Sequence, residues 1–129
     1  MLHTVAGYVL IVVHLALWLW AAGGMAEWLG INVPWPPYSN PDFPRWLLLI
    51  HWTAVLVAAT GYLLGAWQGW SGTPSFMFLG YGLMAMVCVI ETFGYMTSST
   101  KYLAMALEFT TYAGILYLLH RPAFQAEHF

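Results

Sequence analysis

The sequence predicts an all-α integral membrane protein, a four-transmembrane-helix bundle in a single domain, residues 1–129, with both termini on the same side. Hydrophobic residues make up 61% of the chain and charged residues 6%, whereas a soluble domain has about 25% charged residues. The few charges also leave stretches long enough to cross the hydrocarbon core, which takes about 20 helical residues. This composition excludes a soluble enzyme and a nucleic-acid-binding protein, which needs a basic surface.

The positions of the charges and of one proline divide the chain into four helices. Residues 4–26 carry no Asp, Glu, Lys or Arg, and because no basic segment precedes them we expect a retained helix rather than a cleaved signal peptide. Residues 46–90 are also free of full charge, which is too long for one helix. Thr73 and Pro74 are typical of an N-cap and first helical position, so a new helix begins there. The predicted helices cover about 4–26, 46–70, 74–96 and 101–120.

An even number of crossings places residues 31–45 and 97–101 together on one side of the membrane, here named side B, opposite the termini on side A. Five of the seven prolines fall in the first of these loops, which should therefore be stiff and non-helical. Its aromatic residues indicate either a docking surface or lid, or an interfacial aromatic belt. Arg45 and Lys101 on side B outnumber Arg121 on side A, which favours a cytoplasmic side B.

Small residues mark a packed face of the second predicted helix. Gly61, Gly65 and Gly69 recur every four residues, and small side chains let helix backbones approach closely in lipid. This spacing predicts a helix-packing contact, within the bundle or against another subunit. His51 lies on the same face, and His14 shares a small-residue face of the first helix, so both should point toward protein.

Two carboxylates within the predicted membrane spans are the strongest functional signal. An ionised carboxylate near the membrane centre costs at least about 2.5 kcal/mol, so Glu91 and Glu108 should face a protein interior. Glu91 precedes Ser99, the centre of the predicted turn, by eight residues, and Glu108 follows it by nine. Equal offsets in an antiparallel hairpin mean equal depth, roughly 8–12 Å below side B at 1.5 Å per residue. His51, six residues after Arg45, reaches the same level.

This Glu/His cluster has several interpretations. Glu91 and Glu108 could act as an acid–base pair, one protonated and one ionised, or join His51, Tyr95 and Tyr112 in binding a polar or cationic ligand. Alternatively, the carboxylates only hydrogen-bond to neighbouring hydroxyls and fix packing. Histidine and carboxylates also suit zinc or iron. Because the Glu-x-x-His motif of di-metal bundles is absent, we expect no metal.

The two membrane histidines also raise the question of a haem. Bis-His ligation needs both imidazoles at one level on opposite faces of the haem, but His14 and His51 differ in predicted depth by about 10 Å. We therefore expect no cofactor. Ligation of a shared pigment or haem by His14 or His51 alone is left open.

Three functions fit these observations. The first is a small polytopic membrane protein that acts within an oligomer or as an accessory subunit of a larger energy-transducing complex, because so short a bundle has much lipid-facing surface. The second is a stand-alone membrane enzyme, of isomerase or cyclase type, or a binding protein for a lipophilic small molecule. The third is a proton-coupled transporter of a small cation. The expected partners are the lipid bilayer, other membrane subunits or a second copy, and a lipophilic ligand.

Overall fold

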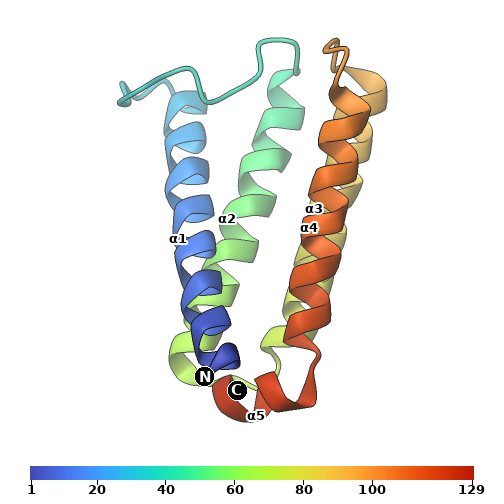
Figure 1. Ribbon diagram of the computed structural model, residues 1–129. Helices are drawn as coiled ribbons and strands as arrows, with labels where there is room; N and C mark the ends of the chain where they lie inside the picture. The colour runs from blue at the N-terminus through green and yellow to red at the C-terminus, as the bar shows by residue number, and fades with distance from the viewer.

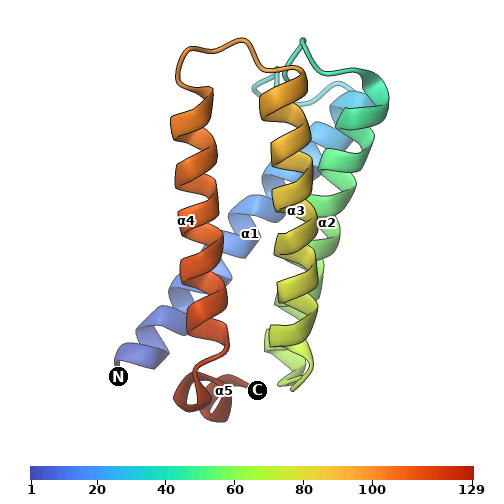
Figure 2. The same cartoon turned by 90° about the vertical axis from the view of Figure 1, so that its right-hand side faces the viewer.

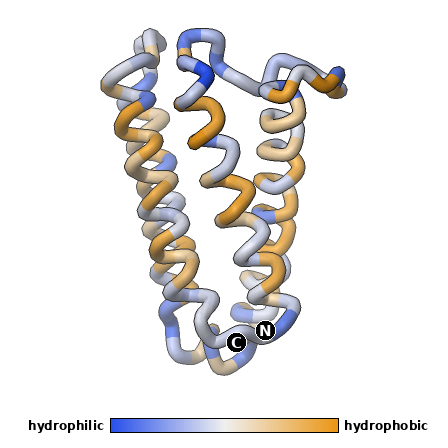
Figure 3. The backbone as a smooth tube through the Cα atoms, turned by 180° about the vertical axis from the view of Figure 1, so that it is seen from behind, coloured by the Kyte–Doolittle hydropathy of each residue, from blue (hydrophilic) through white to orange (hydrophobic).

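The computed structural model describes all 129 residues as five helices with no strand. Four helices are long and apolar enough to cross a membrane, which confirms the predicted four-helix architecture. Both termini lie at the same end of the bundle (Figure 1), and the backbone between the two ends is mostly apolar (Figure 3). The helices are α1 (Leu2–Trp28), α2 (Arg45–Gln68), α3 (Thr73–Gly94), α4 (Lys101–Leu119) and α5 (Pro122–His128).

The boundaries differ from the predicted ones by at most two residues. Helix α2 ends at Gln68 because Gly69 adopts a left-handed conformation with φ 62°, and its N–H donates to the carbonyl of Gly65. Glycine reaches this conformation without steric cost and commonly ends helices. The sequence spacing had predicted that Gly69 belongs to a helix-packing stripe. In the structure Gly69 instead caps α2.

Helix α5 was not predicted. Pro122 occupies its first turn, where a missing N–H costs nothing. Phe124 is fully buried, and the side-chain amide of Gln125 donates to the carbonyl of Leu119 at 3.0 Å. The short helix thus turns back under the side A end of the bundle (Figure 1).

The remaining two glycines of the α2 stripe lie against α3 of the same chain. A methyl group at Gly61 would approach the Phe76 ring to 2.0 Å, and one at Gly65 would approach the Thr73 hydroxyl to 2.2 Å. Only a hydrogen at these positions lets α2 and α3 come this close.

Helix α4 is packed less tightly than the other spanning helices. It lies mainly against α3, and Leu119 is its single buried residue. Figure 2 shows α4 standing beside α3, with α1 crossing obliquely behind them. One flank of the bundle is therefore left uncovered by protein.

The proline-rich segment, residues 29–44, is non-helical and is fastened over side B. Its two ends are joined by Trp28 and Arg45, each of which donates a side-chain hydrogen bond to the other's carbonyl, at 2.9 and 3.0 Å. The carboxylate of Glu27 accepts the backbone N–H groups of Tyr38 and Ser39, both at 2.9 Å. These bonds hold the loop against the end of the bundle.

Candidate functional site

A histidine and a carboxylate from two neighbouring helices form a direct contact. His51 on α2 and Glu91 on α3 approach to 2.5 Å between Nδ1 and Oε1, and their side chains are 19% and 8% exposed. This contact places the two groups at a common level, the relationship that the residue spacing had predicted. A hydrogen bond through Nδ1 fixes the orientation of the imidazole ring.

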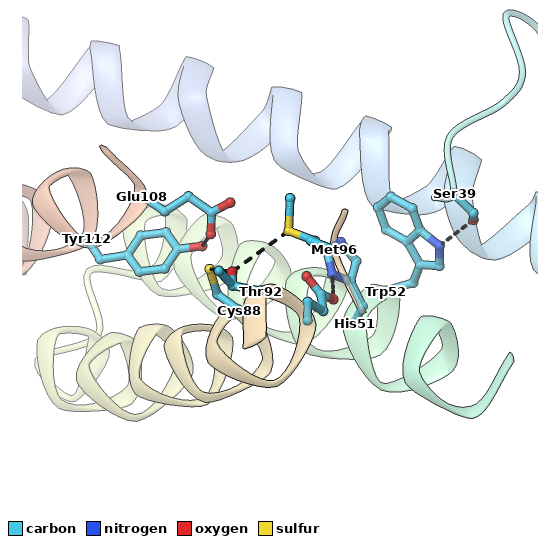
Figure 4. Close-up of polar contacts among 9 residues, drawn as sticks. Ser39, His51, Trp52, Cys88, Thr92, Met96, Glu108 and Tyr112 are labelled. Atoms are coloured by element: carbon cyan, nitrogen blue, oxygen red, sulfur yellow. Dashed lines mark hydrogen bonds and ion pairs between the residues drawn. The ribbon is translucent and has the colours of Figure 1, made fainter. Parts of the chain in front are cut away.

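The second carboxylate comes from the loosely packed helix. Glu108 on α4 accepts a hydrogen bond from the hydroxyl of Tyr112, one turn further along, at 3.1 Å. Figure 4 shows this pair on one side of the site, with His51 and Trp52 on the other and Cys88 and Thr92 between them. Glu108 is solvent-accessible in the isolated chain, because α4 covers only part of the cluster.

These groups line a cavity of about 300 Å³ within the membrane-spanning part of the bundle. All four spanning helices contribute to it, and nine of its thirteen lining residues are hydrophobic. Its polar groups come from α2, α3 and α4. The lining residues are Leu17, Trp20, His51, Ala54, Val55, Met84, Val87, Cys88, Glu91, Leu107, Glu108, Thr111 and Tyr112.

A second cavity, of about 190 Å³, lies between the cluster and the proline-rich loop. It shares Trp20, His51, Glu91 and Glu108 with the larger cavity. Aromatic residues from the loop and from α2 complete its wall. The remaining lining residues are Tyr38, Asn40, Phe43, Leu48, Trp52 and Met96.

Not every predicted site residue reaches these cavities. Tyr112 lines the larger one, but Tyr95 lines neither. Helix α3 ends at Gly94, so Tyr95 leaves the helical conformation with φ −135° and ψ −30°. Its ring lies instead 6.3 Å from that of Trp46, centre to centre, in an aromatic contact.

His14 is separate from the cluster and fully buried. One ring nitrogen, Nδ1, lies 2.7 Å from the carbonyl of Leu10, to which it donates. The other, Nε2, accepts a hydrogen bond from the hydroxyl of Tyr81 at 2.7 Å. The imidazole also stacks on Tyr62, with ring centres 3.9 Å apart. Since both nitrogens are engaged, His14 has no free lone pair for a haem or pigment, a role that the sequence had left open.

Several lining residues were missed in the sequence. Cys88 precedes Glu91 by three positions and Thr111 follows Glu108 by three, which is the spacing of one helix face. That spacing was a usable signal. Trp20 carried no comparable signal, because an aromatic residue near a helix end is typical of the membrane interface.

No lysine or arginine lines either cavity. Arg45 is held by the carbonyl of Trp28 at 3.0 Å, and Lys101 donates to the carbonyl of Met96 at 3.1 Å. Arg121, the third of the three Lys and Arg residues, lies at the opposite end of the bundle. The carboxylates of the cluster therefore have His51 as their one potentially cationic neighbour.

Fold and site together define a multi-pass helical protein with an internal cavity that is apolar over most of its wall and acidic at one end. No protein-family model, curated protein or solved structure matches the chain. What the site can do chemically follows from its geometry. It can enclose an apolar body and present two carboxylates and an imidazole to a polar group on that body.

Proposed function

We propose that this protein binds a lipophilic small molecule within the membrane. The observation that carries the proposal is the cavity of about 300 Å³ between α1, α2, α3 and α4. Ligand sites are typically mostly apolar cavities of about 300–1,000 Å³ with a few placed polar groups. An apolar cavity of about 150 Å³ in another protein is enough to bind benzene.

The route of the ligand to this cavity is supported by the exposure of α4. Leu107, Glu108 and Thr111 line the cavity and are themselves exposed. In a bilayer this flank faces lipid, so a molecule dissolved in the membrane can reach the cavity without crossing water. A lipophilic compound fits this route better than a water-soluble one.

The polar end of the cavity also suits chemistry on a bound molecule. Glu91 and Glu108 both line it, and general acid–base catalysis requires two groups that can exchange protons with one substrate. An isomerisation or cyclisation by proton transfer is the reaction class that this pair would serve. Binding is the function proposed here, and such a reaction would depend on it.

The proposal is tested by closing the cavity from its lipid-facing side. Thr111→Trp places a large ring at a lining position. Thr110→Trp is the matched control, because both threonines are exposed and donate to the carbonyl four residues earlier, yet Thr110 lines neither cavity.

The probe is 1-adamantanol, measured by calorimetry on protein in lipid nanodiscs. The unaltered protein and Thr110→Trp should bind it equally, whereas Thr111→Trp should bind it at least about tenfold more weakly, a loss of about 1.4 kcal/mol. Equal affinity for both tryptophan variants, or no binding by the unaltered protein, would contradict the proposal.

A second candidate is the subunit role, which the exposure of α4 favours. Leu119 is the one buried residue of this helix, and the carboxylate of Glu108 is costly to leave in lipid. Gly61 and Gly65 no longer support a partner, because they contact α3 of the same chain. Native mass spectrometry from mild detergent would show a stable oligomer if α4 is covered by a second copy, and a monomer if it is not.

A further inference from the structure

The two cavities meet at the acidic cluster. Four side chains belong to both walls: Trp20, His51, Glu91 and Glu108. A molecule in the larger cavity thus reaches the loop-side cavity at the point where the carboxylates lie. The larger wall is mostly hydrophobic, whereas the smaller has four aromatic rings among its ten residues, so the two ends would receive different parts of one ligand.

Carboxylates outnumber cationic side chains at this junction. Glu91 and Glu108 meet one imidazole, that of His51, and no lysine or arginine lines either cavity. Glu91 hydrogen-bonds through Oε1 alone, to His51. Its Oε2 accepts no hydrogen bond within the chain and is not among the buried side-chain atoms that lack a partner. This oxygen is therefore open to the cavity and free to accept a hydrogen bond from a bound molecule.

Aromatic rings surround the same space. Trp20, Tyr38, Phe43 and Trp52 all line the loop-side cavity. Trp20 meets both Trp52 and His51 edge-on, with ring centres 4.7 and 5.6 Å apart. Aromatic faces attract organic cations through their quadrupoles, and cages of such rings recognise ammonium groups in other proteins. Carboxylates together with aromatic rings therefore favour a cation with alkyl substituents.

We infer that the loop-side cavity binds the ammonium group of a lipophilic amine whose apolar body occupies the larger cavity. This inference rests on the proposed function and specifies its ligand class. In the arrangement that follows, an N–H of the ammonium donates to the free Oε2 of Glu91. Glu108 supplies a second negative charge, and the Trp20 ring closes one side.

Other polar groups fit less well. An anionic head group would meet two carboxylates and no lysine or arginine, which is repulsive. A metal ion such as Ca²⁺ takes about six to eight oxygen ligands, whereas this wall has two carboxylates and no group of three metal-ligating side chains. A neutral hydroxyl can donate one hydrogen bond but leaves the negative charge uncompensated.

Three compounds with the same apolar body and different polar groups distinguish a cationic, a neutral and an anionic ligand. The probes are 1-aminoadamantane, 1-adamantanol and 1-adamantanecarboxylate, which at pH 7 are cationic, neutral and anionic. Affinities are measured by calorimetry on the full chain in nanodiscs of zwitterionic lipid. Because a hydrogen bond to a charged group is roughly twice as strong as one between neutral groups, the amine should bind at least about tenfold more tightly than the alcohol. The carboxylate should bind most weakly.

Two variants assign the preference to the carboxylates. Glu91→Gln and Glu108→Gln should each weaken amine binding by about tenfold and leave the alcohol nearly unchanged. Glu108 is exposed and on the loosely packed helix, so its substitution does not threaten folding. Asp42→Asn is the matched control: it removes one charge on side B, where Asp42 accepts a hydrogen bond from Thr97, but lines neither cavity.

Each outcome bears on one proposal. If the amine and alcohol bind equally, or the carboxylate binds most tightly, the ammonium inference is overturned while lipophilic binding stands. It is also overturned if both glutamine variants keep full amine affinity, or if Asp42→Asn weakens amine binding as much as they do. If none of the three compounds binds, the proposed function itself fails.

Discussion

Replacing Gly65 by alanine tests how tightly α2 and α3 are packed. The added methyl carbon would lie 2.2 Å from Oγ1 and 2.9 Å from Cγ2 of Thr73, well inside van der Waals contact. Thr73 cannot easily rotate away, because it is fully buried and its hydroxyl donates to the carbonyl of Trp70 at 2.6 Å. The two helices must therefore separate, or Thr73 must give up its hydrogen bond.

The expected change in the free energy of unfolding of Gly65→Ala is the sum of two opposing effects. Alanine is favoured over glycine in a helix by about 1 kcal/mol, whereas forcing extra carbon into a packed contact costs about 1–3 kcal/mol. Gly82→Ala isolates the first effect, because a methyl group at Gly82 meets nothing within 4 Å. We expect the free energy of unfolding of Gly65→Ala to lie about 1–3 kcal/mol below that of Gly82→Ala.

The assay is reversible unfolding in mixed micelles of increasing SDS content, followed by circular dichroism. Combining Gly65→Ala with Thr73→Ala removes both clashing atoms, so the double variant should be more stable than the sum of the single effects by about 1 kcal/mol or more. Equal stability of Gly65→Ala and Gly82→Ala, or strict additivity in the double variant, would refute the close contact.

Two further predictions use the same unfolding assay or hydrogen exchange. Tyr81→Phe leaves the buried Nε2 of His14 without its hydrogen-bond donor and should lower the free energy of unfolding by about 1–3 kcal/mol. The hydroxyl of Tyr102 makes no hydrogen bond within the chain, so Tyr102→Phe should leave the stability unchanged. Similar losses in the two variants would argue against the buried bond. The Thr4 hydroxyl donates to Glu127 and holds the pKa of that carboxyl below its ordinary value of 4.5. The ionised form is therefore favoured in the folded state, and this contribution is present above pH 4.5 and lost as the pH falls through the lower folded pKa. The protection of α5 amides from exchange, relative to the intrinsic exchange rate at each pH, should fall over that acidic range. Thr4→Val should reduce this pH dependence, and an unchanged protection profile in the variant would contradict the assignment.

The sequence was most informative where the membrane itself imposes the rule. Uncharged length located four spans, because every backbone polar group in lipid must be satisfied within a helix. The common depth of His51, Glu91 and Glu108 followed from residue counting, because helical rise converts sequence distance into depth. Residue counting does not specify where a helix ends. Tyr95 was therefore assigned to the site, although α3 ends just before it.

The features that sequence reasoning missed depend on tertiary packing. The loop-side cavity depends on Glu27, which holds the backbone of Tyr38 and Ser39 over the bundle. These contacts join residues eleven and twelve positions apart, and no local sequence pattern predicts them. The short helix α5 was missed because proline is found both after the end of one helix and in the first turn of another. What favours a new helix here is the burial of Phe124, a tertiary contact that the local sequence does not show.

Because the spanning helices differ in length, the geometry of the cavity should depend on the thickness of the surrounding bilayer. Helix α1 has 27 residues and α4 has 19, or about 40 and 28 Å at 1.5 Å per residue. Helix α4 already matches a hydrocarbon core of about 30 Å, whereas α1 must tilt to fit. Its oblique path behind α4 is visible in Figure 2. A thicker bilayer should let α1 stand more upright and move Leu17 and Trp20, its two cavity-lining residues, relative to Glu108. Ligand affinity measured in lipids of different chain length should therefore change even though no residue has been altered.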